Sequence, residues 1–311
     1  MGGICNRNTG REPRLTHRAR AITMVLLASF FCPPLLSAES PSPDPRPSAT
    51  VVPEYLEHWE FGIDVNEDRG PRFFIDPIVP LYRSADNGQT VFLEPRLSYR
   101  NQEWLLNFGG GYRRLVANRA WMLGGNMFYD YESEYSHSRV GLGLEGLSSY
   151  AEARTNVYIP TSGERTVEEL AGGTTHERAV PGFDMELGVP VPYYSRVKIF
   201  GGFNWYDSPD FKQRYGWTLR TEYKPVPFIV IDGTVGDDTK TNVDWGLKVA
   251  FRIPLGGNVE SVDSPLRLDS TWFPKSDASV HVFDLVERHH EIVIQRARTS
   301  TTGLTVEAGR S

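Results

Sequence analysis

The sequence predicts an all-β fold, a transmembrane barrel of about twelve antiparallel strands. Three observations lead to this prediction. The N-terminus has the layout of an export signal, and beyond it no apolar stretch reaches the roughly 18 residues that a membrane-spanning helix needs. Over roughly 200 residues, apolar and polar side chains instead alternate with the period of two that is typical of a strand. Membrane barrel strands alternate in this way because one face meets lipid and the other a watery lumen.

Residues 1–38 are predicted to be a signal peptide. Five arginines between Arg7 and Arg20 precede the short apolar run Ala21–Phe31, and the small residues Ser37 and Ala38 offer a cleavage site. A soluble N-terminal helix is the alternative, but the Pro33-Pro34 pair would break it. Export of the remaining chain is therefore expected.

Cysteine use and charge narrow the chemistry. Both cysteines, Cys5 and Cys32, lie in the predicted leader, so the exported chain has no thiol chemistry and no thiolate metal site. Without residues 1–38 the chain has 28 basic and 38 acidic residues, a net charge of −10. An acidic chain without a basic block is a poor ligand for a phosphate backbone, so no nucleic-acid partner is expected.

The strands are expected in residues 55–255, after a Pro/Ser-rich periplasmic linker over residues 39–54. About twelve alternating segments of roughly 10 residues follow one another, which is the length that a tilted membrane strand requires. The clearest of them are residues 59–66, 91–100, 104–113, 121–131, 139–145, 183–189, 214–223 and 243–253.

The polar face of these segments favours a membrane barrel over a soluble sandwich or soluble barrel. A soluble sheet would expose Lys, Thr and Ser on that face, whereas here it carries Arg and Glu mixed with Gly. Trp and Tyr near the segment ends fit an aromatic girdle at the lipid interfaces. The residues predicted to face the lumen are Glu94, Arg96, Arg113, Asn126, Arg139, Glu145, Arg154, Glu186, Arg220 and Lys248.

An even strand count places both ends of the barrel on the periplasmic side of the bacterial outer membrane. The longest connection, Thr161–Pro181, is then extracellular. Tight turns at Val116–Arg119 and Lys224–Pro227 are periplasmic, as expected from the short turns found on that side of such barrels.

Two stretches resemble the barrel of inverse autotransporters of the intimin/invasin type. Residues 121–147 read WMLGGNMFYDYESEYSHSRVGLGLEGL, which is similar to the fifth and sixth strands of that barrel, and the similarity continues into Asn156–Pro160 and Pro181–Asp184. Residues 285–294 are similar to the segment just after the barrel, with His289-His290 where Asn-Asn is usual. The resemblance covers about residues 55–297.

The resemblance implies that the segment after the last strand, within residues 256–311, turns back through the lumen to the surface. Phe283–His290 would form a short helix or plug, and Glu291–Arg298 would run extended through the lumen. Arg296 and Arg298 would meet the lumen acids Glu94, Glu145 and Glu186. The expected plug and linker residues are Leu285, Val286, Glu287, Arg288, Glu291 and Ile292.

The resemblance also implies a function in adhesion and secretion: the barrel anchors its own C-terminal segment and translocates it to the cell surface. No catalytic residue, cofactor or metal is expected. The expected partners are outer-membrane lipids, the barrel-assembly machinery and periplasmic chaperones. Family members continue into a long adhesive passenger, which is expected here to be absent, encoded separately or lost by truncation, so a host or cell-surface ligand is expected only if a passenger exists.

The last strand resembles the signal by which the assembly machinery recognises barrels, in the order polar, any, Gly, two any, apolar, any, aromatic. Asp244, Gly246, Val249 and Phe251 fit it in order.

Two other function classes make different predictions for this chain. A stand-alone small pore or structural barrel is the alternative to a translocating barrel, and it would conduct ions. An outer-membrane enzyme is not expected, because no spacing of His and acidic residues marks a catalytic site. The G-x-G-x-x-G pattern at Gly141–Gly146 lies within one alternating segment, whereas a dinucleotide fingerprint opens a helix.

Overall fold

The computed structural model describes residues 58–67, 69–170, 173–253, 264–273, 276–300, 302 and 305–307. All of them belong to one compact unit, Thr50–Ser311. The predicted signal peptide and the predicted linker lie outside the described residues. Among the described residues, no helix has the length and apolar character to cross a membrane.

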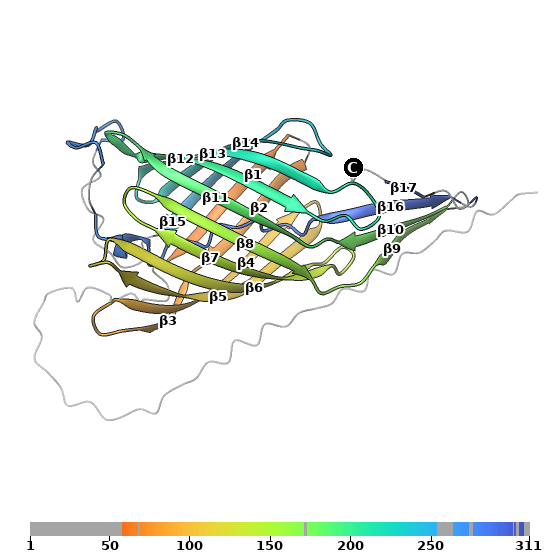
Figure 1. The fold of residues 1–311 in the computed structure, drawn as a ribbon, viewed down its shortest axis with the longest axis horizontal. Coiled ribbons are helices and arrows are strands. Elements are labelled where there is room, and N and C mark those ends of the chain that lie inside the picture. Colours follow the sequence, from red (N-terminus) through yellow and green to blue (C-terminus); the bar gives the residue numbers. More distant parts are fainter. Residues whose placement is uncertain are drawn as a thin grey trace, which may run out of the picture. The chain divides into compact units, whose positions relative to one another are not determined.

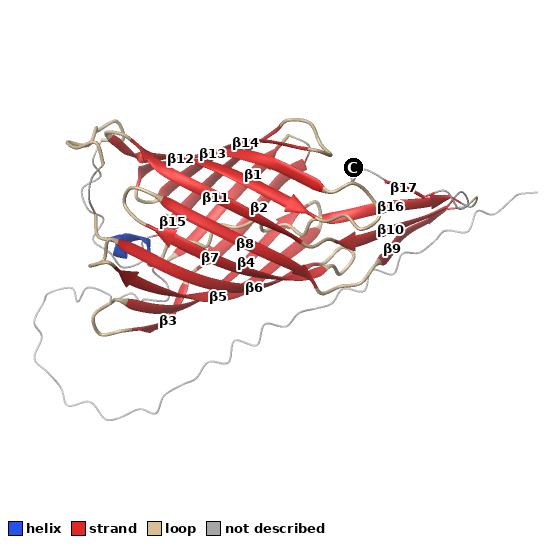
Figure 2. Cartoon of the chain, viewed as in Figure 1, coloured by secondary structure: helices blue, strands red, loops and turns tan. Residues whose placement is uncertain are grey.

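A closed antiparallel barrel of twelve strands dominates the described chain (Figure 1, Figure 2), as predicted. Each strand pairs with the next, the last strand pairs with the first, and the second strand pairs with β4 to complete the ring. The strands are β1 (Trp59–Asn66), β2 (Arg69–Pro77) with its continuation β3 (Val79–Arg83), β4 (Gln89–Arg100), β5 (Glu103–Val116), β6 (Trp121–Glu132), β7 (Ser138–Leu147), β8 (Glu152–Pro160), β11 (Gly182–Val191), β12 (Tyr194–Tyr206), β13 (Arg214–Val226), β14 (Ile229–Asp238) and β15 (Asp244–Ile253).

β2 and β3 are two parts of one strand. β2 pairs with β4 from Phe73 opposite Tyr99 to Ile75 opposite Leu97, and β3 continues along the same partner. Between them, the amide of Ile78 donates a 2.8 Å hydrogen bond to the carbonyl of His58. The interruption therefore leaves the count of twelve unchanged.

Burial along the strands is inverted relative to a soluble protein. Leu144 and Leu187 are each 66% exposed, whereas the charged residues Glu94, Arg113 and Arg139 are almost fully buried. Because side chains alternate across a strand, one face of the wall is apolar and points outward while the other is charged and points inward. This is the arrangement of a barrel whose solvent is lipid outside and water inside.

The barrel begins and ends at the same rim, since Trp59 of β1 lies opposite Ile253 of β15. We call this the terminal rim and the opposite one the hairpin rim. The short turns predicted at Val116–Arg119 and Lys224–Pro227 lie at the terminal rim, and the long connection Thr161–Pro181 lies at the hairpin rim. The structure thus places these two short turns and the longest connection at opposite rims, as the sequence predicted.

The long connection contains a hairpin that the sequence did not predict, β9 (Arg165–Leu170) and β10 (Gly173–Ala179). β10 also pairs with β16 (Ile294–Ser300), and β16 with β17 (Thr305–Glu307), so a second sheet has the order β17-β16-β10-β9. A 3₁₀ helix, η2 (Ala278–His281), precedes β16 and contacts β6.

Candidate functional site: the inward face of the barrel and the segment that contacts it

The ten residues predicted to face the lumen all lie on barrel strands and are all shielded from solvent. Asn126, Glu186 and Lys248 are half-buried. The other seven are less than one-tenth exposed, and they are Glu94, Arg96, Arg113, Arg139, Glu145, Arg154 and Arg220.

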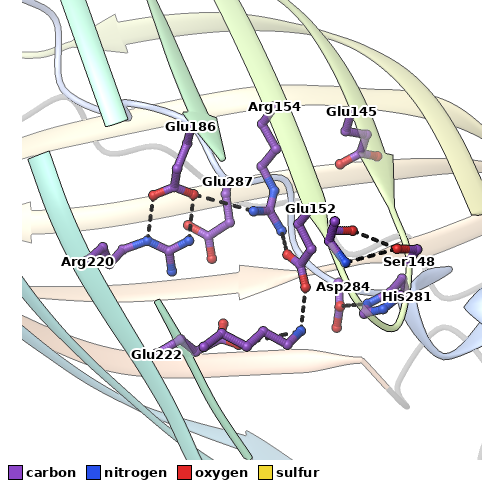
Figure 3. Close-up of polar contacts among 12 residues, drawn as sticks. Glu145, Ser148, Glu152, Arg154, Glu186, Arg220, Glu222, His281, Asp284 and Glu287 are labelled. Carbon is purple, nitrogen blue, oxygen red and sulfur yellow. Dashed lines mark hydrogen bonds and ion pairs between the residues drawn. The ribbon is translucent and has the colours of Figure 1, made fainter. Parts of the chain in front are cut away.

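Opposite charges on strands that lie one or two places apart in the barrel neutralise one another along the lumen wall. Glu186 lies between Arg220, at 2.7 Å, and Arg154, at 3.4 Å (Figure 3). Arg220 also pairs with Asp232 at 3.1 Å, and Lys248 pairs with the same carboxylate at 2.6 Å. Such pairing is what allows so many charges to be buried, because an unpaired buried charge is costly.

The segment after the barrel meets the wall first at the terminal rim. The Asp277 carboxylate accepts a hydrogen bond from Arg119 in the β5–β6 turn, and the Ala278 amide donates to the Arg119 carbonyl at 2.8 Å. The Arg119 hydrogen bond, together with one from the Ser279 amide, lowers the pKa of Asp277. Ala278 and Val282 then pack against Met122 and Leu147 of the wall.

Further along, the ring of Phe283 stacks on His58 with centroids 4.1 Å apart. His281 contacts Asp284 at 2.7 Å, within the segment itself (Figure 3). The Val286 side chain packs in a buried cluster with Ile78, Phe92 and Phe128, and its amide lies within 3.2 Å of the Glu94 carboxylate.

Arg288 makes the most buried ion pair of the segment. Its two terminal nitrogens donate to the two oxygens of Asp130, each at 2.7 Å. The same carboxylate accepts from Arg139 at 2.7 Å and from Asn107 at 2.8 Å. We call Asp130, Arg139, Asn107 and Arg288 the Asp130 cluster. The Arg288 guanidinium also lies 4.6 Å from the ring centroid of Phe128, a cation–π distance.

The last contacts of the segment lie at the hairpin rim. Glu291 forms ion pairs with Arg72, at 2.5 Å, with Arg100, at 3.2 Å, and with Arg69. The carbonyl of Val293 accepts from the Val180 amide at 3.0 Å, where the pairing of β16 with β10 begins. Contacts of residues 277–293 therefore advance along the inward face of the wall from one rim to the other.

Three expectations for this segment were wrong. The short helix is Ala278–His281, earlier than expected, and Phe283–His290 is not helical, so only the plug remains of the expected helix or plug, and it stays a prediction. Residues from Ile294 form strand β16 on β10 and do not run extended among the lumen acids. Arg296 pairs with Glu177 of β10 at 3.2 Å, and Arg298 lies opposite Thr175.

The reason for the third error is that the expected acids already have partners. Arg113 pairs with Glu145 at 2.6 Å, and Arg154 and Arg220 pair with Glu186. Glu94 does meet the segment, but through the backbone amide of Val286.

Sequence reasoning missed the residues that hold the segment by charge. Asp130 alternates with the apolar residues Tyr129 and Tyr131, and nothing in the sequence distinguishes it from the other polar residues of the strand. Its role appears only where β5, β6, β7 and the segment come together. Arg72 and Arg100 were missed for the same reason.

Other candidate ligand sites are weak. Gly141–Gly146 lies inside the continuous strand β7, as expected, and so does not form a dinucleotide loop. Among the described residues, carboxylate oxygens of Glu103, Glu132 and Glu134 approach within 4.8 Å of one another. Acidic groups this close are common without a metal, and each of the three has a contact within the protein.

Comparison with known proteins identifies the family. The family described as "Inverse autotransporter, beta-domain" matches residues 56–290. The chain is 22% identical over 245 residues to "Inverse autotransporter adhesin YeeJ" from Escherichia coli (strain K12), an alignment that covers 74% of this chain and 10% of that protein. It is 22% identical over 280 residues to "Intimin" from Escherichia coli O111:H-, covering 83% of this chain and 28% of that one.

A solved chain from "Unveiling the Mechanism Behind the in-meso Crystallization of Membrane Proteins" has the same fold, with a TM-score of 0.64 at 20% identity, over 77% of this chain and 99% of that one. The chain spans between a tenth and a little over a quarter of the two curated relatives. The family match includes all twelve barrel strands and most of the segment that contacts their inward face. The chain is a bacterial outer-membrane barrel and belongs to the inverse autotransporter beta-domain family.

Proposed function

We propose that the barrel anchors its own C-terminal segment in the outer membrane and carries it to the cell surface. The observation that supports this most directly is the course of the chain. The last barrel strand ends at the terminal rim with Ile253, whereas β16 is paired with the long hairpin of the opposite rim. The contacts between these points are made with inward-facing side chains, so the segment is held where a translocated chain would pass.

The chemistry of these contacts suits a pore through which a polypeptide chain passes. Six of the lumen side chains that touch the segment bind its backbone, which every residue carries. The segment's bonded groups are the carbonyls of Val282, Asp284, Glu287, His289 and His290 and the amides of Val286 and His289. The barrel side chains are Glu94, Asn107, Arg113, Arg139, Asn156 and Tyr158.

Binding through the backbone is independent of sequence, since carbonyl and amide groups repeat along any chain. A lumen lined in this way can hold successive parts of a moving polypeptide in turn. Charged side chains of the segment add specific contacts. Arg288 pairs with Asp130, and Glu291 pairs with Arg72 and Arg100, so these side-chain pairs define a resting position.

A disulfide test addresses the proposal. His176 of β10 and Ala297 of β16 are opposite one another, so a His176→Cys/Ala297→Cys variant, with Cys5 and Cys32 replaced by Ser, should cross-link under mild oxidation in intact cells. His176→Cys/Arg298→Cys is the matched control, because its second cysteine is one position out of register and points to the other face of the sheet.

We expect the in-register pair to form a bond that a membrane-impermeant reductant added to intact cells removes. No cross-link above the level of the out-of-register control, or a cross-link that the reductant reaches only after lysis, contradicts the proposal.

The alternative is a small pore, and one observation favours it. A cavity of about 370 Å³ remains beside the segment, lined by polar residues that include Arg154, Glu186, Asp232 and Lys248. If this cavity conducts, the intact protein should pass ions in a planar bilayer as readily as a variant lacking residues 276–311. If the segment acts as a plug, the deletion should raise the conductance strongly.

We also propose a role for β15 in assembly. Asp244, Gly246, Val249 and Phe251 lie in order on this strand, which closes the ring against β1. Phe251 is exposed on the outer face, where a membrane-embedded assembly machine would meet it. Phe251→Ala should lower the yield of heat-modifiable, folded barrel in cells, and an unchanged yield speaks against the assignment.

A further inference from the structure

Residues 264–273, which we call the rim loop, form a structured extension at the terminal rim (Figure 1). The loop is docked on the turn between β11 and β12. The Tyr193 amide donates to the Trp272 carbonyl at 3.0 Å, and the Asp269 amide donates to the Tyr193 carbonyl at 2.8 Å. The Asp269 carboxylate accepts from the Ser195 amide at 2.7 Å. Three hydrogen bonds thus hold the loop in one place on the wall.

The loop lies on the lipid side of the wall. The Tyr194 hydroxyl donates to the Pro265 carbonyl at 2.7 Å, and the Tyr194 ring lies 6.3 Å from that of Tyr223. Tyr223 alternates with Glu222, which is buried among the lumen charges, so Tyr223 points outward. Pro265 is therefore beside the outer aromatic residues of this rim.

The rim loop exposes large apolar side chains although it is ordered by hydrogen bonds. Leu266 is 80% exposed, Leu268 67% and Trp272 57%, and Phe273 is also exposed beside Trp272. Its only charged residues are Arg267 and Asp269, and they balance each other. Four exposed apolar side chains on one short ordered loop at the edge of a membrane protein mark an interaction surface.

We propose that the rim loop is an interfacial anchor. Its side chains Leu266, Leu268, Trp272 and Phe273 insert into the boundary between headgroups and acyl chains of the leaflet at the terminal rim. The partner is a lipid surface because the loop continues the outward apolar band of β11 and β12, where Val189 and Ile199 face each other and are exposed. Trp and Tyr at the end of such a band are the residues that the membrane interface favours.

Spin labelling tests this directly, because the only two cysteines are Cys5 and Cys32 and both are replaceable by Ser. A nitroxide at Leu266→Cys, in protein reconstituted into phosphatidylethanolamine/phosphatidylglycerol bilayers, is compared for its accessibility to oxygen and to a water-soluble nickel chelate. Leu142→Cys on the outer wall reports the lipid environment, and Asn87→Cys in the β3–β4 turn of the same rim reports water.

We expect the Leu266 label to resemble the Leu142 label: its accessibility to oxygen should be several-fold higher than its accessibility to the nickel chelate. The Leu266 label should lie at a shallower depth in the bilayer than the Leu142 label. A label with the nickel accessibility of Asn87 overturns the proposal, because the loop is then in water. A label shielded from both reagents also overturns it, in favour of a protein covering the loop. Leu268→Cys repeats the measurement at an independent position and must give the same result.

Discussion

Substitution of Arg288 by Met is expected to loosen the segment from the lumen without unfolding the barrel. The change removes two hydrogen bonds of 2.7 Å to Asp130, both deeply buried, while the Met side chain still fills the space against Phe128. Asp130 keeps Arg139 and Asn107 as hydrogen-bond partners, so its buried carboxylate remains paired within the wall.

Removal of one member of a buried ion pair typically costs about 3–5 kcal/mol. Because Asp130 retains another cation, the lower end of this range applies, about 3 kcal/mol. At about 1.4 kcal/mol for each factor of ten, the ratio of docked to released segment should fall roughly a hundredfold. Arg288 belongs to the segment and Asp130 to the wall. The substitution therefore weakens the binding of the segment to the wall and leaves the pairing between wall strands in place.

The assay is the open fraction of single barrels in a planar bilayer at neutral pH. Arg96→Met is the matched control: Arg96 is also a buried arginine, and its ion pair with Asp76, at 2.8 Å, joins two wall residues. We expect a large rise in open fraction for Arg288→Met and little change for Arg96→Met. An open fraction for Arg288→Met equal to that of the control would refute the view that the Asp130 cluster locks the segment.

Three further outcomes follow from the same structure. Gly141→Ala should also raise the open fraction, because a Cβ there would lie 2.5 Å from the Arg288 guanidinium, and it should add little to Arg288→Met since both act on one contact. Leu142→Arg on the outer wall should lower the free energy of unfolding from a bilayer by about 2–4 kcal/mol near the midplane, as measured in urea, whereas Val306→Arg on β17 should have almost no effect. The Asp277–Arg119 contact should be complete above the ordinary carboxyl pKa of 3.8 and be lost only as the pH falls through the lowered pKa of Asp277; carboxyl titration by NMR measures this, and an unshifted titration contradicts it.

The barrel wall was predictable because its two solvents impose a strict alternation. Trp104, Leu106 and Phe108 face lipid while Asn107 between them is fully buried, and this pattern is readable from the sequence alone. The same alternation predicts which residues face the lumen. A membrane imposes a strand length of about 10 residues, and the chain contains about twelve alternating segments of that length, which predicts the strand count.

The second sheet was not predictable in this way because it has no lipid-facing side. β10 reads GTTHERA and β16 reads IQRARTS, without apolar alternation, and each becomes a strand through pairing with the other. For this reason the sequence of the β9–β10 hairpin predicts only a long connection between two barrel strands. Strand pairing between segments more than a hundred residues apart depends on where the intervening residues bring the chain, and local sequence does not encode this.

The partners of individual charges were equally out of reach. The alternation of apolar and polar residues predicts that Glu145 and Glu186 face inward, but not which arginine each one meets. Glu145 and Glu186 are neutralised by the wall, and only Asp130 takes an arginine from the segment. The choice depends on distances across the lumen between strands that are far apart in sequence.

The central claim, that the C-terminal segment reaches the cell surface, is tested most directly by thiol labelling of intact cells with a membrane-impermeant maleimide. Single cysteines are placed at Thr302 beyond β16, at Gly163 in the long connection of the hairpin rim, and at Asn87 in a turn of the terminal rim, with Cys5 and Cys32 replaced by Ser. We expect Thr302→Cys to be labelled as readily as Gly163→Cys and Asn87→Cys to be labelled only after lysis. Labelling of Thr302→Cys only after lysis, like Asn87→Cys, would contradict the claim.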